Sequence, residues 1–304
     1  MFYELRRYDV AAGKLAALVD RFESFTVHKW KQYGFRLIGF WTPVVADRSN
    51  QLVYVWGWES LEERAKKNAA WRGEPPLVHF AAVNDRNGFF LLGRQARPGF
   101  VWSDLVGKAV ISFGGAPTPW LCMQAVLRRH GVDPARITFL RGLSTADAVA
   151  AFRAGKGEFI EHGPPVVDHL LADGTGHLVA AMGDATGPVP FSSFMASRAT
   201  LTRDRERIVR FIRGLARAQR WMASSGAEPI AAVIAPAFPD IDARIRVAAV
   251  ERYLRQSTWA RDPLLTRPGF DTLQAILQAG GFIKRTHRFE DLVDVEIARE
   301  TGRY

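Results

Sequence analysis

Two consecutive prolines behind a glycine divide this chain into two parts with different hydrophobic patterns. The segment is Arg72-Gly73-Glu74-Pro75-Pro76. Glycine and proline end helices, and the residue before a proline is held in extended backbone, so no regular element continues through the segment. The 304 residues suffice for two hydrophobic cores, since a domain usually has about 100 to 200 residues. We therefore expect two domains, residues 1–75 and residues 76–304.

The composition excludes several classes of protein. It is 48% hydrophobic and 24% charged, as in ordinary globular chains. No stretch approaches the roughly 18 apolar residues of a membrane helix. The first seven residues place charges where a signal peptide needs apolar residues, which predicts a cytoplasmic protein; a start further upstream with a signal peptide would move it to the periplasm. Because Cys122 is the only cysteine, no intramolecular disulfide or multi-thiolate metal site can form.

The net charge of +10 raises nucleic acid as a partner, but its distribution argues against one. The 41 basic and 31 acidic residues are spread over both parts of the chain. The most charged run, Arg203-Asp204-Arg205-Glu206-Arg207, alternates in sign, which is typical of a solvated helix face. Nucleic-acid binding depends on concentrated positive charge. We therefore expect no nucleic-acid partner.

The first part has the pattern of a small α+β domain. A strand is expected at residues 2–8, a helix at 15–33 that ends at Gly34, and a hairpin of strands 35–41 and 51–58 around the polar residues 47–50. Ser60 and Glu63 form a capping box that begins a second helix. The order β-α-β-β-α predicts a ferredoxin-like domain that lacks its last strand.

The second part alternates short apolar strands with amphipathic helices. Strands are expected at residues 89–92, 109–113, 137–140, 158–161, 177–182 and 192–196. Helices are expected at 119–130, at 144–153 and from Pro164 onward. This predicts a doubly wound α/β sheet. From Asp204 onward helices dominate, beginning with a long apolar stripe that includes Phe211 and Gln219.

Residues 1 to about 72 resemble the NIPSNAP family. The residues that carry the resemblance are Tyr3-Glu4-Leu5-Arg6, Tyr8, Gly13-Lys14, Gly39-Phe40-Trp41, Asn50-Gln51, Val53-Tyr54-Val55-Trp56 and Arg64. The resemblance implies a ferredoxin-like domain of the dimeric α/β-barrel type, and hence a homodimer formed through this domain. Four residues of this domain have two possible roles. They would either point into a barrel cavity or pack in the core and the dimer interface, and packing is the favoured interpretation. The residues are Arg6, Arg36, Trp41 and Trp56.

Residues from about 77 onward resemble the SsuA-like solute-binding proteins of ABC importers. The residues that carry this resemblance are Asn87-Gly88-Phe89-Phe90-Leu91, Trp102-Ser103-Asp104-Leu105, Gly107-Lys108, His130-Gly131-Val132-Asp133-Pro134, Ala150-Ala151-Phe152-Arg153-Ala154-Gly155, Gly163-Pro164-Pro165, Gly183 and Pro190-Phe191-Ser192-Ser193-Phe194-Met195-Ala196. The resemblance implies a periplasmic-binding-protein-like lobe with C-terminal helices, a small-molecule ligand and an ABC permease as partner. About seventy residues of the first lobe that should precede Phe80 are missing, so half of the ligand cleft would be absent.

The leading candidate site is Gly114-Gly115-Ala116-Pro117-Thr118, between an expected strand and an expected helix. We expect Thr118 as the N-cap and Pro119 as the first helical residue. Free N–H groups and the helix dipole can hold a sulfonate, carboxylate or phosphate there. The alternative is a tight turn that needs glycine for conformational reasons alone.

A second candidate segment, Glu161-His162-Gly163, ends the next expected strand on the same crevice. His162 could donate a hydrogen bond or stack on a ring, or be a solvated loop residue. Glu161 would repel an anion, which favours a ligand with a donor edge such as a pyrimidine. The SsuA-like resemblance adds Asp184, Phe191 and Ser192 as residues that flank the cleft, the alternative being two ordinary loops.

No catalytic constellation, metal site or cofactor site is expected. His162 and His169 are seven residues apart, but Pro164 interrupts any helix that could align them on a metal. We therefore predict non-catalytic binding of a small organic solute of the pyrimidine, sulfonate or aromatic carboxylate class. The alternative is a cofactor-free enzyme of the dimeric α/β-barrel type, with His28 as its acid–base residue. A third interpretation is a rearrangement remnant without a ligand.

Overall fold

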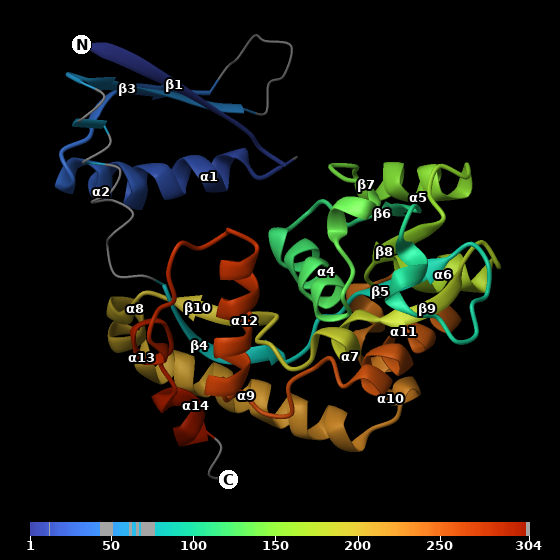
Figure 1. Cartoon of the computed structure of the whole chain (residues 1–304). Coiled ribbons are helices and arrows are strands. Elements are labelled where there is room, and N and C mark those ends of the chain that lie inside the picture. Colours follow the sequence, from blue (N-terminus) through green and yellow to red (C-terminus); the bar gives the residue numbers. More distant parts are fainter. Residues whose placement is uncertain (12, 43–50, 61–62, 65–66, 68–76, 302–304) are drawn as a thin grey trace. The chain divides into compact units, whose positions relative to one another are not determined.

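The computed structural model describes residues 1–11, 13–42, 51–60, 63–64, 67 and 77–301. The chain forms two compact units, Met1–Pro76 and Leu77–Tyr304, which are described separately (Figure 1). The loop expected at 47–50 and the boundary segment 72–76 lie outside the described residues.

The first unit has an antiparallel sheet with a helical segment on one face (Figure 1). Its strand order is β1-β3-β2, formed by Phe2–Asp9, Gln51–Trp58 and Arg36–Trp41. The helical segment consists of α1 (Leu15–Arg21), a π-helical turn (Phe22–Thr26) and α2 (Val27–Gln32). Gly34 follows with a positive φ of 69°, which suits glycine at the end of a helix. One half of the expected capping box is present, because Ser60 Oγ accepts from Glu63 N–H at 3.0 Å; the Glu63 carboxylate accepts at 2.6 Å from the N–H of Glu59, one residue before the N-cap.

Alternation along the strands gives this sheet a buried and an exposed face. The buried face packs Tyr54, Trp56 and Trp58 against Phe22 and Trp30 of the helical segment. The exposed face carries apolar side chains from β1 and β2, namely Tyr3, Leu5, Ile38 and Trp41. The first unit therefore has one hydrophobic core and one apolar sheet face that the unit itself does not cover.

The second unit contains a five-stranded mixed sheet in the order β7-β6-β8-β5-β9. The strands are Thr138–Leu140, Ala109–Ile111, Phe159–His162, Phe90–Gly93 and His177–Ala181 in that order. β6 runs parallel to β7 and β8, whereas β5 is antiparallel to both of its neighbours. The expected doubly wound pattern is therefore wrong for β5, because short apolar strands buried on both faces look the same in either direction.

Helices cover both faces of this sheet (Figure 1). On one face, α4 (Pro117–Arg129) packs its Met123, Val126 and Leu127 against the strands, and α7 (Met182–Thr186) lies beside it. On the other face, α5 (Thr145–Arg153) and α6 (Val166–Ala172) bury Phe152 and Leu170. The sheet is thus buried on both sides, as its apolar strands require.

A second, two-stranded sheet pairs β4 (Val78–Asn84) with β10 (Ser192–Ala196). β4 was not expected from the sequence, whereas β10 has the expected bounds. The remaining helices are α8 (Arg198–Arg203), α9 (Arg205–Ser224), α10 (Ala227–Ile234), α11 (Ala243–Gln256), α12 (Arg267–Ala279), α13 (Phe289–Leu292) and α14 (Glu296–Thr301). Along α9, Ile212 and Gln219 are buried as expected, but Phe211 is 50% exposed, so the buried stripe is narrower than the sequence suggested.

Two chain segments connect the two sheets of the second unit, and the Gln256 side chain bonds to both segments. The first segment runs from β4 to β5 and includes Asn87, and the second runs from β9 to β10 and includes Gly183. Gln256 donates from Nε2 to the Asn87 carbonyl and accepts from Gly183 N–H, both at 2.8 Å. A Cβ on Gly183 would lie 2.6 Å from the Gln256 side chain and 2.7 Å from the Asn87 carbonyl, so only glycine fits there.

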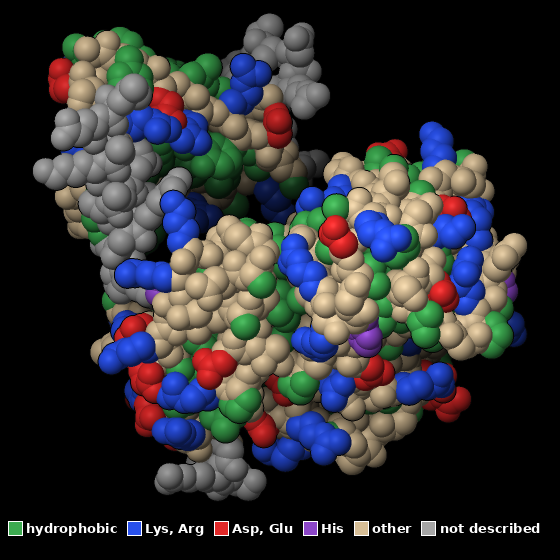
Figure 2. Space-filling view, in the orientation of Figure 1, with side chains coloured by type: hydrophobic (Ala, Val, Ile, Leu, Met, Phe, Trp, Pro, Cys, Tyr) green, Lys and Arg blue, Asp and Glu red, His purple; other side chains and the backbone are tan. Residues whose placement is uncertain are grey.

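Charge is mixed over the surface of the second unit. Figure 2 shows basic and acidic side chains interspersed on the visible face, and no continuous basic stripe crosses that face. Ion pairs such as Arg205–Glu300 at 2.8 Å and Arg86–Asp184 at 3.0 Å join opposite charges. Among the residues that the structure describes, no helix is long and apolar enough to cross a membrane.

Candidate functional site

The two leading candidate segments meet where β6 and β8 end. These strands are parallel neighbours, with Ile111 opposite Ile160, so the residues that follow them emerge at the same edge of the sheet. Ser112, Gly114, Glu161 and His162 line a narrow crevice there that has no room for a water molecule. A ligand at this edge would therefore lie over the mouth of the crevice, on the segments 113–118 and 162–163, which we call the strand-end site.

Helix α4 begins at the strand-end site, two residues earlier than expected. Its N-cap is Ala116 in extended backbone (φ −153°, ψ 152°), and Pro117 is the first helical residue. Thr118 is therefore not the N-cap, and this prediction was wrong. Pro117 and Pro119 both suit the first helical position, and the helix begins at Pro117. Both prolines lack N–H groups, so the anion donors at this terminus are the N–H groups of Gly114, Gly115, Ala116 and Thr118. The segment 114–117 is exposed, which leaves these donors accessible.

Four rings form an aromatic cluster beside the helix terminus. The Phe113 ring lies 4.8 Å from the Phe89 ring and 5.2 Å from the His162 ring, between centroids. Phe89 also contacts Phe191 at 6.0 Å. Phe89, Phe113 and Phe191 are only partly buried, so the cluster offers ring faces and edges to a ligand.

His162 is a neutral hydrogen-bond donor in this cluster. Its Nδ1 accepts from the Gly163 N–H at 2.9 Å, and burial lowers the pKa of the ring. A neutral imidazole with Nδ1 as acceptor carries its proton on Nε2. Nε2 is buried and has no hydrogen-bond partner among the described residues, so this N–H can donate to a ligand.

Glu161 lies beneath the crevice as a neutral acid. Its side chain is fully buried and accepts a hydrogen bond from Ser112 Oγ at 3.0 Å, and Oε1 has no partner in the described part of the chain. Burial raises the pKa of Glu161 to about 8, although the hydrogen bond from Ser112 opposes the shift. The carboxyl is thus largely protonated and uncharged at neutral pH. The sequence analysis expected Glu161 to repel an anion, and a neutral Glu161 does not do so.

The other candidate residues are distributed around the strand-end site. Phe191 and His162 join it through the aromatic cluster, and Gly163 lies against Phe89 with ordinary van der Waals room for a Cβ. Asp184 is exposed on α7, where it pairs with Arg86, and Ser192 begins β10 opposite Asn84. No contact with the aromatic cluster is recorded for Asp184 or Ser192 in the described residues. Sequence reasoning missed Phe89 and Phe113 as site residues. Phe113 directly precedes the candidate segment 114–118, and Phe89 lies in the segment 87–91 that carries the SsuA-like resemblance.

The candidate residues of the first unit are mostly structural. Trp56 is buried in the core, and the Arg6 guanidinium lies 5.6 Å from the centre of its ring. Arg36 pairs with Glu59 at 3.1 Å, and Trp41 is 52% exposed on the open sheet face. His28 is exposed on α2. No group of three or more potential metal ligands is found among the described residues of either unit.

Comparison with protein families assigns both parts of the chain. Residues 3–88 match the NIPSNAP family model, and residues 108–235 match the model of the NMT1-like family. The putative binding protein YtlA of Bacillus subtilis is 30% identical over 226 residues, which cover 74% of this chain and 68% of that protein.

Solved structures share the fold of the second unit. The alkanesulfonate-binding protein SsuA from Xanthomonas axonopodis, solved with MOPS bound, is 20% identical and superposes with a TM-score of 0.52 over 77% of this chain and 75% of its own. The aliphatic sulphonate binding protein SsuA from Escherichia coli gives a TM-score of 0.55 at 18% identity, over 74% of this chain and 75% of its own. These likenesses establish the periplasmic-binding-protein-like fold. The chain therefore belongs to the NMT1-like, SsuA-type family of solute-binding proteins and carries a NIPSNAP domain at its N-terminus.

Proposed function

We propose that the strand-end site binds a small organic solute without transforming it. One observation carries the proposal: unpaired N–H donors of the segment 114–118, the free Nε2 donor of His162 and the aromatic cluster all converge where β6 and β8 end. Donors beside ring faces suit a ligand that has an anionic or acceptor group on an apolar body. Family membership supports small-molecule binding in general.

Within this proposal, the solute is an aromatic sulfonate or aromatic carboxylate. The backbone N–H groups at the helix N-terminus and the neutral His162 donor favour an anionic group, and the neutral Glu161 does not oppose it. The Phe89, Phe113 and Phe191 rings favour an aromatic body over a short aliphatic one. A pyrimidine satisfies the ring contacts but lacks the negative charge, so we rank it lower.

We also propose that residues 76–304 lack most of the first lobe of such a binding protein. The chain covers 75% of either SsuA structure, so a quarter of each has no counterpart here. The sheet formed by β4 and β10 has only two strands, next to a complete five-stranded sheet. A site with one wall would bind more weakly than a closed cleft, because less of the solute is removed from water.

Thermal unfolding of the purified chain with a panel of solutes tests the proposed function. At one hundred times its dissociation constant, a solute that binds only the folded state should stabilise by about 2.7 kcal/mol, which raises the melting temperature by roughly 5 to 10 °C. We expect benzenesulfonate or benzoate to give this shift, and nitrate and uracil to give less. A well-folded sample that responds to none of these solutes would contradict the proposal.

The family relation also bears on partners and location. We propose an ABC permease as the partner, since SsuA-like proteins deliver small molecules to such permeases, and a periplasmic location if an upstream signal peptide exists. The comparisons favour this binding interpretation over an enzyme that uses His28 of the first unit.

We further propose that the NIPSNAP domain forms a homodimer through its open sheet face. Leu5, Ile38 and Trp41 are each about half exposed on this face and together form an apolar surface that a second copy would cover.

Changing Leu5→Glu should therefore convert the dimer to a monomer, because two carboxylates would be buried at the interface. Light scattering coupled to size-exclusion chromatography measures the mass. Phe25→Glu is the matched control, since Phe25 is equally exposed but lies on the helical segment. A monomeric parent protein, or a Leu5→Glu variant that remains dimeric, would contradict this assignment.

A further inference from the structure

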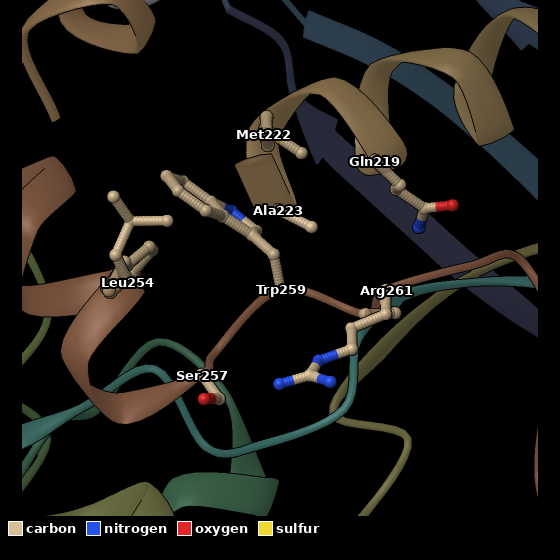
Figure 3. Close-up of a pocket in the computed structure, with 9 residues that line it drawn as sticks. Gln219, Met222, Ala223, Leu254, Ser257, Trp259 and Arg261 are labelled. Carbon is tan, nitrogen blue, oxygen red and sulfur yellow. The ribbon is translucent and has the colours of Figure 1, made fainter. Parts of the chain in front are cut away.

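The second unit contains another pocket that shares no residue with the strand-end site. It lies between the C-terminal part of α9, the end of α11 and the loop that follows, and its volume is about 250 Å³ (Figure 3). Its lining residues are Gln219, Met222, Ala223, Tyr253, Leu254, Ser257, Trp259, Ala260 and Arg261. We call it the α9–α11 pocket.

The walls of this pocket are polar and apolar in nearly equal parts, and Trp259 provides an aromatic face. Trp259 lies between the two helices, with its indole directed toward Leu254 and beneath Met222 (Figure 3). The Tyr253 ring meets the indole edge to face at 5.3 Å, which holds the indole in place. A flat apolar group of modest size could pack on this indole.

Arg261 is the single charged side chain among the lining residues, and it lacks a counter-ion. No hydrogen bond or ion pair joins its guanidinium to any residue in the described part of the chain. Asp262, its neighbour in sequence, accepts a hydrogen bond from Leu264 N–H at 2.7 Å and forms no ion pair with Arg261 among the described residues. In Figure 3 the guanidinium extends below Trp259 toward the Ser257 hydroxyl.

The backbone fixes Ser257 at the edge of the pocket. Ser257 has a left-handed conformation (φ 54°, ψ 46°) as the C-cap of α11, and its N–H donates to the Leu254 carbonyl at 3.0 Å. A serine in this conformation is uncommon, and the neighbouring Thr258 N–H bond to the Tyr253 carbonyl at 2.9 Å stabilises it. The Ser257 side chain thus lies at the edge of the pocket, on the side toward which the Arg261 guanidinium extends (Figure 3).

Two helices end at the pocket, which limits the charge of its ligand. α9 ends at Ser224 and α11 at Gln256, and the carbonyl end of a helix carries partial negative charge. A doubly charged phosphate would be repelled by both helix ends, with only one guanidinium in compensation. A single carboxylate can pair with Arg261 through two parallel hydrogen bonds.

We propose that the α9–α11 pocket binds a small organic monocarboxylate with a flat apolar body. The carboxylate pairs with Arg261 and the Ser257 hydroxyl, and the apolar body packs on Trp259. A free aromatic acid and an aromatic amino acid share this chemistry. The amino acid also carries an ammonium group, and the carbonyl ends of α9 and α11 would stabilise its positive charge.

Isothermal titration calorimetry with phenylacetate tests the proposal, and phenylalanine serves as the second probe. We expect saturable binding of at least one probe, and loss of binding by about 10- to 100-fold with Arg261→Gln, since a charge-assisted pair is lost. Neutral phenylacetamide should bind more weakly than phenylacetate by a similar factor. Arg255→Gln is the matched control, because Arg255 is exposed on α11 and pairs with Glu251.

The same titration of a Gly115→Trp variant separates this pocket from the strand-end site. We expect this variant to retain a saturable site for at least one probe and to lose it when Arg261→Gln is added, whereas the parent protein also offers the strand-end site to an aromatic carboxylate. The proposal is overturned if neither probe binds at millimolar concentration, if Arg261→Gln leaves the affinity within about twofold, or if Gly115→Trp abolishes binding. The last outcome would support the strand-end site instead, and thermal unfolding confirms that every variant is folded.

Discussion

Replacing Glu161 by glutamine should make the protein more stable in alkaline solution and leave its stability in acid nearly unchanged. Burial raises the pKa of Glu161 from 4.5 to about 8 in the folded state. Below pH 4.5 both states are protonated. Between these values the unfolded chain loses the proton while the folded chain keeps it, so the free energy of unfolding falls by roughly 5 kcal/mol as the pH rises. Glutamine has no proton to lose and escapes this penalty.

Urea unfolding of the parent protein and of Glu161→Gln, at about pH 5 and about pH 9, measures this effect. We expect the variant to gain several kcal/mol over the parent protein at the higher pH only. Glu228→Gln is the control, because Glu228 is exposed on α10. Equal stability of the Glu161→Gln variant and the parent protein in alkali would show that Glu161 is not buried as the structure has it.

Placing tryptophan at position 115 should abolish solute binding at the strand-end site, with a loss of affinity of at least about 100-fold. A Cβ on Gly115 would lie 2.5 Å from the Phe113 ring, so any side chain displaces Phe113 from the aromatic cluster. A large side chain also covers the N–H donors at the start of α4. Because Gly115 is exposed and its φ is not in the left-handed region, folding should tolerate the change.

The melting-temperature shift produced by benzenesulfonate measures this loss, because the α9–α11 pocket is proposed to take a carboxylate. Gly214→Trp is the matched control, since Gly214 is an exposed glycine on α9 with nothing within 4 Å of its Cβ position. An undiminished shift in the Gly115→Trp variant would place the solute elsewhere on the molecule.

Local sequence signals predicted those parts of the fold that depend on neighbouring residues. A helix over residues 144–153 was expected, and α5 begins there with Ser144 accepting from Asp147 N–H at 3.1 Å; Ser60 with Glu63 begins a helix, also as expected. The start of α4 was misplaced because Pro117 and Pro119 satisfy the same local rule. The strand β4 and the direction of β5 depend on partners distant in sequence, which no local pattern specifies.

The candidate site shows the same division. The segments 114–118 and 161–163 come at the ends of expected apolar strands. Because strand ends meet at one edge of a sheet, the sequence was enough to predict these segments as parts of a site. Phe89 and Phe113 were missed because an aromatic residue at a strand end looks like any core residue in sequence. The neutral state of Glu161 was also unpredictable, since it results from burial beneath a crevice, which depends on segments distant in sequence.

The bond network of Gln256 has a consequence for how quickly a solute exchanges. Binding proteins with two lobes trap a solute by bending at the segments that connect the lobes. Here the Gln256 side chain bonds to both of those segments, at Asn87 and Gly183, and the Arg86–Asp184 ion pair joins them as well. Bending at these segments would strain or break these bonds, so they oppose closure around a solute. A site that does not close retains its solute only through direct contacts, and we therefore expect rapid release.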